Sequence, residues 1–334
     1  MIDTIYIEDE IARHPRTQEI VGRFPQAVTI SCQRYGEVFN RRAQNFRLQK
    51  SNPALILAHK HDGFVLKTPA GYGIGGQGNY YFSHMLNCIY DCRYCFLQGM
   101  YQSPHYVVFV NYEDFAQNVQ RVASQGRGIY FFSGYDCDSL ALDQLTGFVD
   151  FFLPVFARLP DTWLELRTKS IQIRALEQHA PSERVVAAFS LSPEAVVGAV
   201  EHQTPSLQRR LAAMVRLARL GWWIGLRFDP LLYFEGYQSA YRALFDVVFD
   251  SLPPERIHSI SLGSLRFPTA MFQKIVRLYP DDPVLAGPLA AHNGLVSYEH
   301  RVHEELMAFC RNELRERVSC DKLFPTAVAD SVGE

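Results

Sequence analysis

The sequence has no apolar run long enough to cross a membrane and no excess of charge of one sign. Its 334 residues hold 33 Lys and Arg against 35 Asp and Glu, a formal net charge of −2. A membrane helix needs about 20 apolar residues, and a surface that binds nucleic acid everywhere needs clustered basic side chains. The N-terminus also lacks the basic region and apolar core of a signal peptide. We therefore expect a soluble cytoplasmic protein.

Two local basic stretches interrupt this balance. The first holds Arg41, Arg42, Arg47 and Lys50, and the second holds Arg209, Arg210, Arg216 and Arg219. Basic residues at helical spacing usually form a solvated helix face. We interpret both stretches in that way.

Cysteine is scarce and unevenly spread. The chain has seven cysteines, an odd number, and three of them crowd into the segment from Cys88 to Cys95. This distribution is poor for a disulfide framework and better for a metal site in a reducing compartment. The cysteines that lie far from this segment are interpreted as structural; they are Cys32, Cys310 and Cys320.

No internal repeat stands out, and the hydrophobic fraction of 48% is enough for a sizeable core. From about residue 79, short β-rich runs alternate with segments of helical period. The runs are Tyr80–Met85, Ile129–Ser133, Trp163–Arg167, Val185–Leu191, Trp223–Phe228 and Ile257–Leu262. The helical segments are 113–125, 139–157, 170–179, 206–220, 237–251 and 269–278. Six βα units predict an α/β protein with a partial (βα)6 TIM-like barrel over 79–279 and a site at the C-terminal strand ends.

Two flanking segments complete the expected organisation. Residues 1–78 hold a strand, a helix and a glycine-rich loop over 71–78, which we interpret as a turn because neither a phosphate-loop lysine nor a helix follows it. Residues 280–334 hold the hairpin signal Asn293-Gly294 and a charged helix around 299–317. Both segments are expected to pack on the barrel.

The three crowded cysteines have the spacing C-x3-C-x2-C and follow the first predicted strand. Thiolates at this density select zinc or an iron–sulfur cluster. Structural zinc needs four ligands, and His84 or Cys137 could supply the fourth only through the fold. Most clusters also use four cysteines, so three suggest a cluster with one iron left open for another ligand.

In this context the motif resembles that of the radical S-adenosylmethionine (SAM) enzymes. The resemblance implies a [4Fe–4S] cluster on Cys88, Cys92 and Cys95. It also implies that SAM binds the open iron and is reductively cleaved to methionine and a 5′-deoxyadenosyl radical. A one-electron donor of the flavodoxin or ferredoxin type is the partner that this chemistry implies.

Longer sequence matches make the chain similar to one family within that class, spore photoproduct lyase, which repairs a thymine dimer in DNA. The matching segments run from Ile5 to Phe267 and include Cys92-Arg-Tyr-Cys95-Phe-Leu-Gln98, Val108–Asn111, Asp143–Thr146, Thr168-Lys169, Phe189-Ser190 and Arg210–Ala213. The family resemblance implies a DNA or nucleotide substrate. It also implies that Lys169 and Ser190 contact SAM and that Tyr94 stacks near the adenosyl group. Gly134, in Ser133-Gly134-Tyr135-Asp136, falls where the class contacts the methionine amino group.

The chain departs from that family at the positions that transfer hydrogen and at those that bind the DNA lesion. Phe96 replaces a tyrosine after the third cluster cysteine, and Tyr135 falls on the position of the hydrogen-donor cysteine. Cys137, two residues further on, is the remaining thiol near that position. Ala290-Ala291 replaces the Arg-Tyr pair of the lesion-binding hairpin. Tyr135 and Cys137 are therefore our candidates for a catalytic hydrogen donor.

Three hypotheses follow for the function. The first is a radical SAM enzyme, lyase-like, whose substrate the sequence does not name. The second is a DNA-repair lyase that reverses spore photoproduct with Cys137 or Tyr135 in the relay. The third is a non-catalytic protein with a structural zinc site.

Overall fold

The computed structural model describes residues 2–42, 44–69 and 71–325. Its largest element is a curled eight-stranded sheet in the order β18-β14-β13-β11-β10-β9-β5-β4. The strands are β4 (Leu66–Lys67), β5 (Gly78–Tyr81), β9 (Ile129–Phe132), β10 (Thr162–Thr168), β11 (Val185–Ser190), β13 (Trp223–Leu231), β14 (Ile257–Ser264) and β18 (Leu323–Pro325). From β5 to β14 they are parallel neighbours in chain order. The predicted partial barrel is therefore confirmed.

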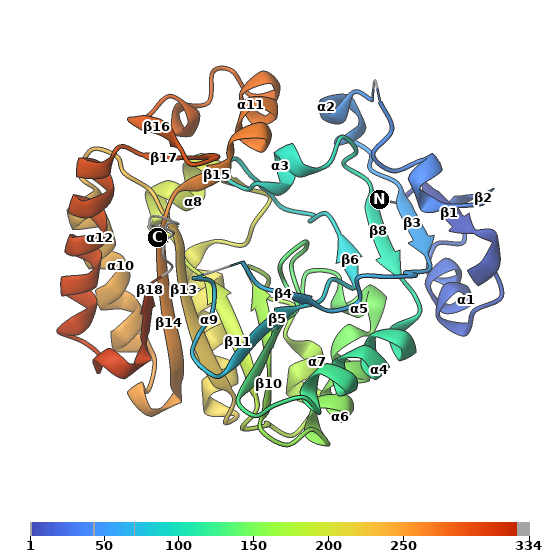
Figure 1. The fold of residues 1–334 in the computed structure, drawn as a ribbon, viewed down its shortest axis with the longest axis horizontal. Helices are drawn as coiled ribbons and strands as arrows, with labels where there is room; N and C mark the ends of the chain where they lie inside the picture. The colour runs from blue at the N-terminus through green and yellow to red at the C-terminus, as the bar shows by residue number, and fades with distance from the viewer. Residues whose placement is uncertain (1, 43, 70, 326–334) are drawn as a thin grey trace.

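The central barrel strand β11 is buried along its whole length because helices cover the outer face of the sheet. Every residue of β11 is buried, as expected for a parallel strand covered on both faces. The outer helices are α4 (Tyr112–Ala123), α6 (Phe148–Ala157), α7 (Arg174–Gln178), α9 (Leu207–Arg219), α10 (Tyr237–Ser251) and α12 (His300–Arg315). Figure 1 shows them flanking the curled sheet. In the described parts of the chain, none of the helices combines the length and apolarity that crossing a bilayer requires.

The helical segment predicted at 139–157 is divided. The structure has a short α5 (Asp143–Thr146) and then α6, with Gly147 between them in a left-handed conformation at φ 61°. A left-handed residue ends a helix readily when it is glycine. The predicted helices at 237–251 and 269–278 coincide with α10 and α11 (Thr269–Leu278).

The first predicted strand, Tyr80–Met85, is wrong in its extent. β5 ends at Tyr81, and Met85 begins β6 (Met85–Leu86), which belongs to another sheet. Between them, Phe82 packs against the ring of Phe152 at a centroid distance of 5.1 Å and is fully buried. The chain therefore leaves the barrel early, because this apolar run packs on α6 instead of extending the strand.

A second sheet stands beside the barrel in the order β2-β1-β3-β8-β6 (Figure 1). Its strands are β1 (Thr4–Glu8), β2 (Val28–Cys32), β3 (Leu55–Ala58), β8 (Tyr106–Phe109) and β6. β8 and β6 come from the region that the sequence assigned to the barrel, and β8 pairs with β3 in parallel. Residues before 78 thus share a sheet with the segment that surrounds the cysteine motif.

The C-terminal region forms a small antiparallel sheet of β15 (Arg266–Pro268), β17 (Leu295–Tyr298) and β16 (Leu289–His292). Asn293 and Gly294 join β16 to β17 with φ values of 48° and 79°. Two positive φ values in a two-residue loop are the requirement of a type I′ hairpin turn. The hairpin prediction is confirmed, and residues 326–334 of the predicted C-terminal segment lie outside the described residues.

Candidate active site

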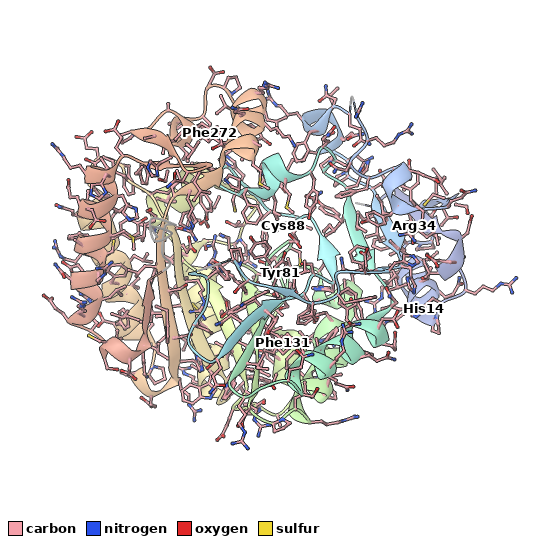
Figure 2. The ribbon with its side chains drawn as sticks, in the orientation of Figure 1. His14, Arg34, Tyr81, Cys88, Phe131 and Phe272 are labelled. Atoms are coloured by element: carbon pink, nitrogen blue, oxygen red, sulfur yellow. The ribbon has the colours of Figure 1, made fainter. Side chains whose placement is uncertain are left out.

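The cysteine motif lies in the loop between β6 and α3 (Leu97–Met100), and Figure 2 shows Cys88 near the centre of the molecule. Within this loop, β7 (Asp91–Cys92) pairs antiparallel with β12 (Glu201–His202), which follows α8 (Glu194–Val200). The loop is therefore fastened to a segment more than a hundred residues later in the chain. All three cysteines are buried or half-buried.

Charged and polar side chains fix this loop through hydrogen bonds and ion pairs to Asp91. Asp91 accepts a hydrogen bond from the Lys50 ammonium, and its second oxygen lies 2.7 Å from Arg93 Nη1. Gln98 Nε2 also donates to Asp91 at 2.7 Å. The expectation that Lys50 belongs to a solvated helix face is thus wrong. Its side chain is mostly buried because it neutralises Asp91 next to the motif.

Burial raises the pKa of all three motif thiols. The pKa of Cys92 rises to about 12, chiefly because its environment excludes water. The pKa values of Cys88 and Cys95 rise for the same reason. Backbone donors also face the motif, since Tyr90 N lies 3.5 Å from Cys88 Sγ and a backbone hydrogen bond from Leu97 lowers the pKa of Cys95.

Lys169 connects the motif to the barrel. It directly follows β10, and its Nζ lies 5.3 Å from the centroid of the Tyr94 ring, within cation–π range. The Tyr94 hydroxyl donates to Glu201 Oε1, and Glu201 Oε2 lies 2.5 Å from Arg210 Nη2. Arg210 is fully buried and also donates to the carbonyl of Ser190 at 3.1 Å. Arg210 is therefore not on a solvated face, contrary to the sequence interpretation.

The cluster of Lys169, Tyr94, Glu201 and Arg210 carries a net positive charge, because two cations face one carboxylate. Burial lowers the pKa of Lys169, but Cys92 and Glu201 outweigh burial, so the net shift is upward. Burial raises the pKa of Glu201, but Lys169 and Arg210 outweigh it and hold that pKa low. Among the described residues, no carboxylate lies within ion-pair distance of Lys169 Nζ. The Lys169 charge is therefore available to an anionic ligand.

The loop after β9 packs closely on β10. A Cβ on Gly134 would lie 2.8 Å from the Arg167 carbonyl oxygen and 2.9 Å from Ser139 Oγ, so no larger residue fits there. Asp138 secures the same loop by accepting from Lys169 N at 2.7 Å and Thr168 Oγ1 at 2.6 Å. These contacts place the backbone of residues 133–138 at the C-terminal strand ends, beside Lys169.

Asp136 has an unsatisfied oxygen. Its Oδ2 accepts from Ser83 Oγ at 2.5 Å, while its Oδ1 is buried without a hydrogen-bond partner in the described structure. Burial raises the pKa of Asp136. An unpaired buried carboxylate oxygen costs free energy and therefore suits a cationic or N–H ligand. No sequence signal beyond its position in the matched segment pointed to this residue.

Tyr135 lies in an aromatic cluster with the residue that follows the third cysteine. Its ring stacks on Tyr81 at a centroid distance of 4.3 Å and contacts Phe96 at 5.6 Å and Tyr72 at 6.0 Å. Burial, helped by the two neighbouring phenols, raises the pKa of Tyr135 to about 12. Its hydroxyl therefore keeps its proton at neutral pH.

Cys137 has a different environment from Tyr135. It is buried in the apolar cluster beneath the N-terminal sheet, with Ile5, Met85 and Val108. Its Sγ lies 3.6 Å from the Ser133 carbonyl oxygen, and burial raises its pKa well above the usual value. Of the cysteines interpreted as structural, Cys32 and Cys310 are buried, whereas Cys320 is exposed.

Three residues singled out by the family resemblance, Ser190, Ala290 and Ala291, make no ion pair among the described residues. Ser190 is buried as the last residue of β11, at the strand end that faces the motif. Ala290 and Ala291 lie exposed on β16, so the hairpin is present without large side chains at these positions. Glu201 was missed by the sequence analysis because a single acid after a helix gives no local signal.

A partial barrel with three cysteines of this spacing after its first strand defines the class of radical SAM enzymes. The family model described as spore photoproduct lyase matches residues 75–284. The chain belongs to the spore photoproduct lyase family, and it is accordingly a radical SAM enzyme.

Curated relatives and solved structures agree with this assignment. Spore photoproduct lyase of Bacillus subtilis (strain 168) is 24% identical over 283 residues, covering 83% of this chain and 82% of the relative. The enzyme of Geobacillus sp. is 23% identical over 272 residues, covering 79% and 76%.

Among solved structures, a substituted spore photoproduct lyase with bound AdoMet and dinucleoside spore photoproduct has the same fold. Its TM-score is 0.83 at 19% identity, with 98% of this chain and 99% of that chain covered. A spore photoproduct lyase complexed with dinucleoside spore photoproduct gives a TM-score of 0.82 at 19% identity, covering 98% of both chains.

Proposed function

We propose that Cys88, Cys92 and Cys95 hold a [4Fe–4S] cluster and that the open strand ends beside them bind SAM. The donor set supports this proposal. Three thiols, with no fourth ligand grouped beside them among the described residues, suit a cluster with one iron left for a non-protein ligand.

The spacing of the sulfur atoms argues against the zinc hypothesis. Tetrahedral zinc with Zn–S bonds of about 2.3 Å brings its ligand sulfurs to about 3.8 Å of one another. Among the described residues, the motif cysteines do not form a ligand group within 4.8 Å, with or without His84 and Cys137. His84 instead stacks on Phe148 at 3.9 Å, and burial lowers its pKa to about 3. A cluster accepts wider spacing, because each thiolate binds a different iron.

The residues around the motif match the chemical groups of SAM. Lys169 offers a positive charge to the carboxylate, and Asp136 Oδ1 offers an unpaired acceptor to the amino group. The Tyr94 ring offers an apolar face, and its hydroxyl is fixed by Glu201. Gly134 and Ser190 line the same strand ends. When bound, the cluster and SAM supply one-electron chemistry that yields methionine and a 5′-deoxyadenosyl radical.

We infer that the substrate is a nucleotide or a lesion in DNA. This inference rests on the family and on the dinucleoside spore photoproduct bound in the solved relatives. A flavodoxin- or ferredoxin-type protein is the expected electron donor. Of our two hydrogen-donor candidates we favour Tyr135, because its ring contacts Phe96 directly after the third cysteine, whereas the Cys137 side chain packs in the apolar cluster with Ile5 and Met85.

The contact between Lys169 and Tyr94 carries the cofactor proposal, and it can be tested directly. Anaerobically reconstituted protein with dithionite and SAM should form 5′-deoxyadenosine, measured by chromatography. Cys92→Ala should lose both the cluster absorbance and the product. Lys169→Met should keep the cluster but raise KM for SAM about tenfold or more, since a charge-assisted contact is worth about 1.5–3 kcal/mol. Lys274→Met, at an exposed lysine of α11, is the matched control.

A fully loaded cluster that forms no 5′-deoxyadenosine would overturn the proposal. So would colourless protein that contains one zinc per chain and no iron, which the zinc hypothesis requires.

The second candidate function is reversal of spore photoproduct itself, which family membership favours. Dinucleoside spore photoproduct incubated with the reconstituted enzyme should then be converted to the unlinked dithymidine product. If SAM is cleaved while the photoproduct remains intact, a different nucleotide-type substrate is indicated. The exposed Ala290 and Ala291 make weaker lesion binding the expected difference from the relatives.

A further inference from the structure

A group of histidines and carboxylates lies at one edge of the N-terminal sheet, away from the cysteine motif. The parallel strands β1, β3 and β8 end at this edge. Glu10 follows β1 in the short helix η1 (Asp9–Ile11), and His59 and His61 follow β3. Asp114 follows β8 in the first turn of α4. Four potential metal ligands from three neighbouring strand ends thus converge.

Three of these side chains have the spacing that a single ion requires. One ligand atom from each of Glu10, His59 and His61 lies within 4.8 Å of the others, and no other such group occurs in the described ranges of the chain. His61 Nε2 lies 2.6 Å from Glu10 Oε1. The two imidazole rings lie 4.4 Å apart between centroids.

His59 has one ring nitrogen near a carboxylate and the other without a partner in the described structure. Its Nε2 lies 3.5 Å from Asp114 Oδ2, while its Nδ1 is buried and has no hydrogen-bond partner in the described structure. A carboxylate on one ring nitrogen orients the other nitrogen toward a metal and increases its basicity. A buried unpaired nitrogen is otherwise costly.

The backbone that carries the histidines is fixed. Glu8 is fully buried and accepts from His59 N at 2.8 Å and Tyr35 N at 2.6 Å. Asn111 accepts from Lys60 N at 2.9 Å and donates to the Lys60 carbonyl at 2.8 Å. The two histidines therefore project from a preorganised segment, which lowers the cost of assembling a site.

We propose that Glu10, His59 and His61 bind a divalent first-row transition-metal ion, with Zn²⁺ as the reference ligand. Two imidazoles and one carboxylate are borderline donors suited to zinc, ferrous iron, cobalt or nickel rather than to calcium or magnesium. Three protein ligands leave at least one coordination position for water. The exposed Glu10 and His61 give the ion a path from solvent.

This metal site is independent of the proposed radical chemistry. Arg34 Nη1 lies 3.3 Å from Glu10 Oε1 in an ion pair. Figure 2 shows Arg34 on the flank of the molecule, apart from the central Cys88. Metal binding would replace this half-exposed ion pair, and such pairs contribute little to stability. Loss of the metal should therefore leave formation of 5′-deoxyadenosine unchanged.

Calorimetric titration of the anaerobic holoenzyme with Zn²⁺ tests the proposal. The wild type should bind one equivalent. His61→Ala and Glu10→Gln should each weaken binding by about tenfold or more, and both are exposed, so folding is preserved. His179→Ala is the matched control, since His179 pairs with one carboxylate, Asp150, at 2.8 Å, and does not belong to the triad. Equal affinity in the wild type and His61→Ala would overturn the proposal.

X-ray absorption at the zinc edge separates this site from adventitious thiol binding. The expected first shell contains only nitrogen and oxygen at about 2.0–2.2 Å. A sulfur shell at about 2.3 Å would assign the zinc to a cysteine such as the exposed Cys320 and would overturn the proposal.

Discussion

Tyr135 and Phe96 lie in one aromatic cluster although both depart from the family pattern. Phe96 offers no O–H, and the nearest phenols in the cluster are Tyr135 and its stacking partner Tyr81. A pKa of about 12 keeps the Tyr135 hydroxyl protonated across the physiological range. We predict that the Tyr135 O–H replaces the S–H that the family resemblance implies at this position. The paired change is therefore consistent with a relay that uses a phenol.

We predict that Tyr135→Phe keeps the formation of 5′-deoxyadenosine but loses most of the dithymidine product from dinucleoside spore photoproduct. The reason is that phenylalanine keeps the packing and removes only the transferable hydrogen. In D2O the wild-type product should gain deuterium, because a phenolic O–H exchanges with solvent; mass spectrometry measures this.

Cys137→Ala is the comparison for that prediction. It should retain product formation and deuterium incorporation, because Cys137 packs among apolar side chains. The opposite pattern, with loss in Cys137→Ala and none in Tyr135→Phe, would assign the hydrogen donor to the cysteine.

At the junction of α5 and α6, the buried carboxyl group of Asp143 makes the folding stability depend on pH. Asp143 accepts from Val149 N at 2.8 Å and thereby begins α6 after Gly147. Burial raises the pKa of Asp143 from 3.8 to about 6. The folded state therefore binds a proton more tightly than the unfolded state does. This contribution to stability is complete below pH 4 and is lost as pH rises through 6.

We predict that Asp143→Asn changes the pH dependence of thermal unfolding. Asparagine keeps an acceptor for Val149 N but does not titrate. The difference in midpoint temperature, wild type minus variant, should increase as pH falls from 7.5 to 5.5, measured by circular dichroism on anaerobic protein. A difference that stays constant over this range would show that Asp143 has an ordinary pKa.

At the scale of the whole molecule, a buried ion pair joins barrel strands that are not adjacent. Arg227 Nη2 on β13 lies 2.6 Å from Glu165 Oε2 on β10, and β11 lies between these two strands. Both side chains are almost completely buried. Arg227 also donates to the Ser259 carbonyl on β14 at 3.0 Å. Within the described residues this network spans the four neighbouring strands β10, β11, β13 and β14. It is therefore placed to hold the curvature of the sheet.

We predict that Arg227→Met lowers the free energy of unfolding by about 3–5 kcal/mol, because it leaves Glu165 charged and buried without its partner. The double variant Glu165→Leu/Arg227→Met should unfold at a higher temperature than Arg227→Met alone, since no unpaired charge remains. Thermal unfolding of the three proteins at equal cluster content measures this. A double variant less stable than the single one would show that the pair itself stabilises the barrel.

Sequence patterns alone determined the features that depend on neighbours in the chain. Alternating periods predicted the βα order, and the positive-φ pair Asn293-Gly294 predicted the hairpin. The C-x3-C-x2-C spacing predicted a metal centre, because three thiols so close in sequence remain close in any compact fold. These signals are local, so they survive without knowledge of tertiary contacts.

The tertiary structure alone decided which distant residues meet. It paired β3 with β8, buried Arg210 against Glu201 and brought Lys50 to Asp91 beside the motif. It also brought Glu10 to His59 and His61, which the alternation of two histidines by itself does not reveal. Contacts between residues so far apart leave no periodic trace in the sequence, because they are set by how the sheets and loops pack together.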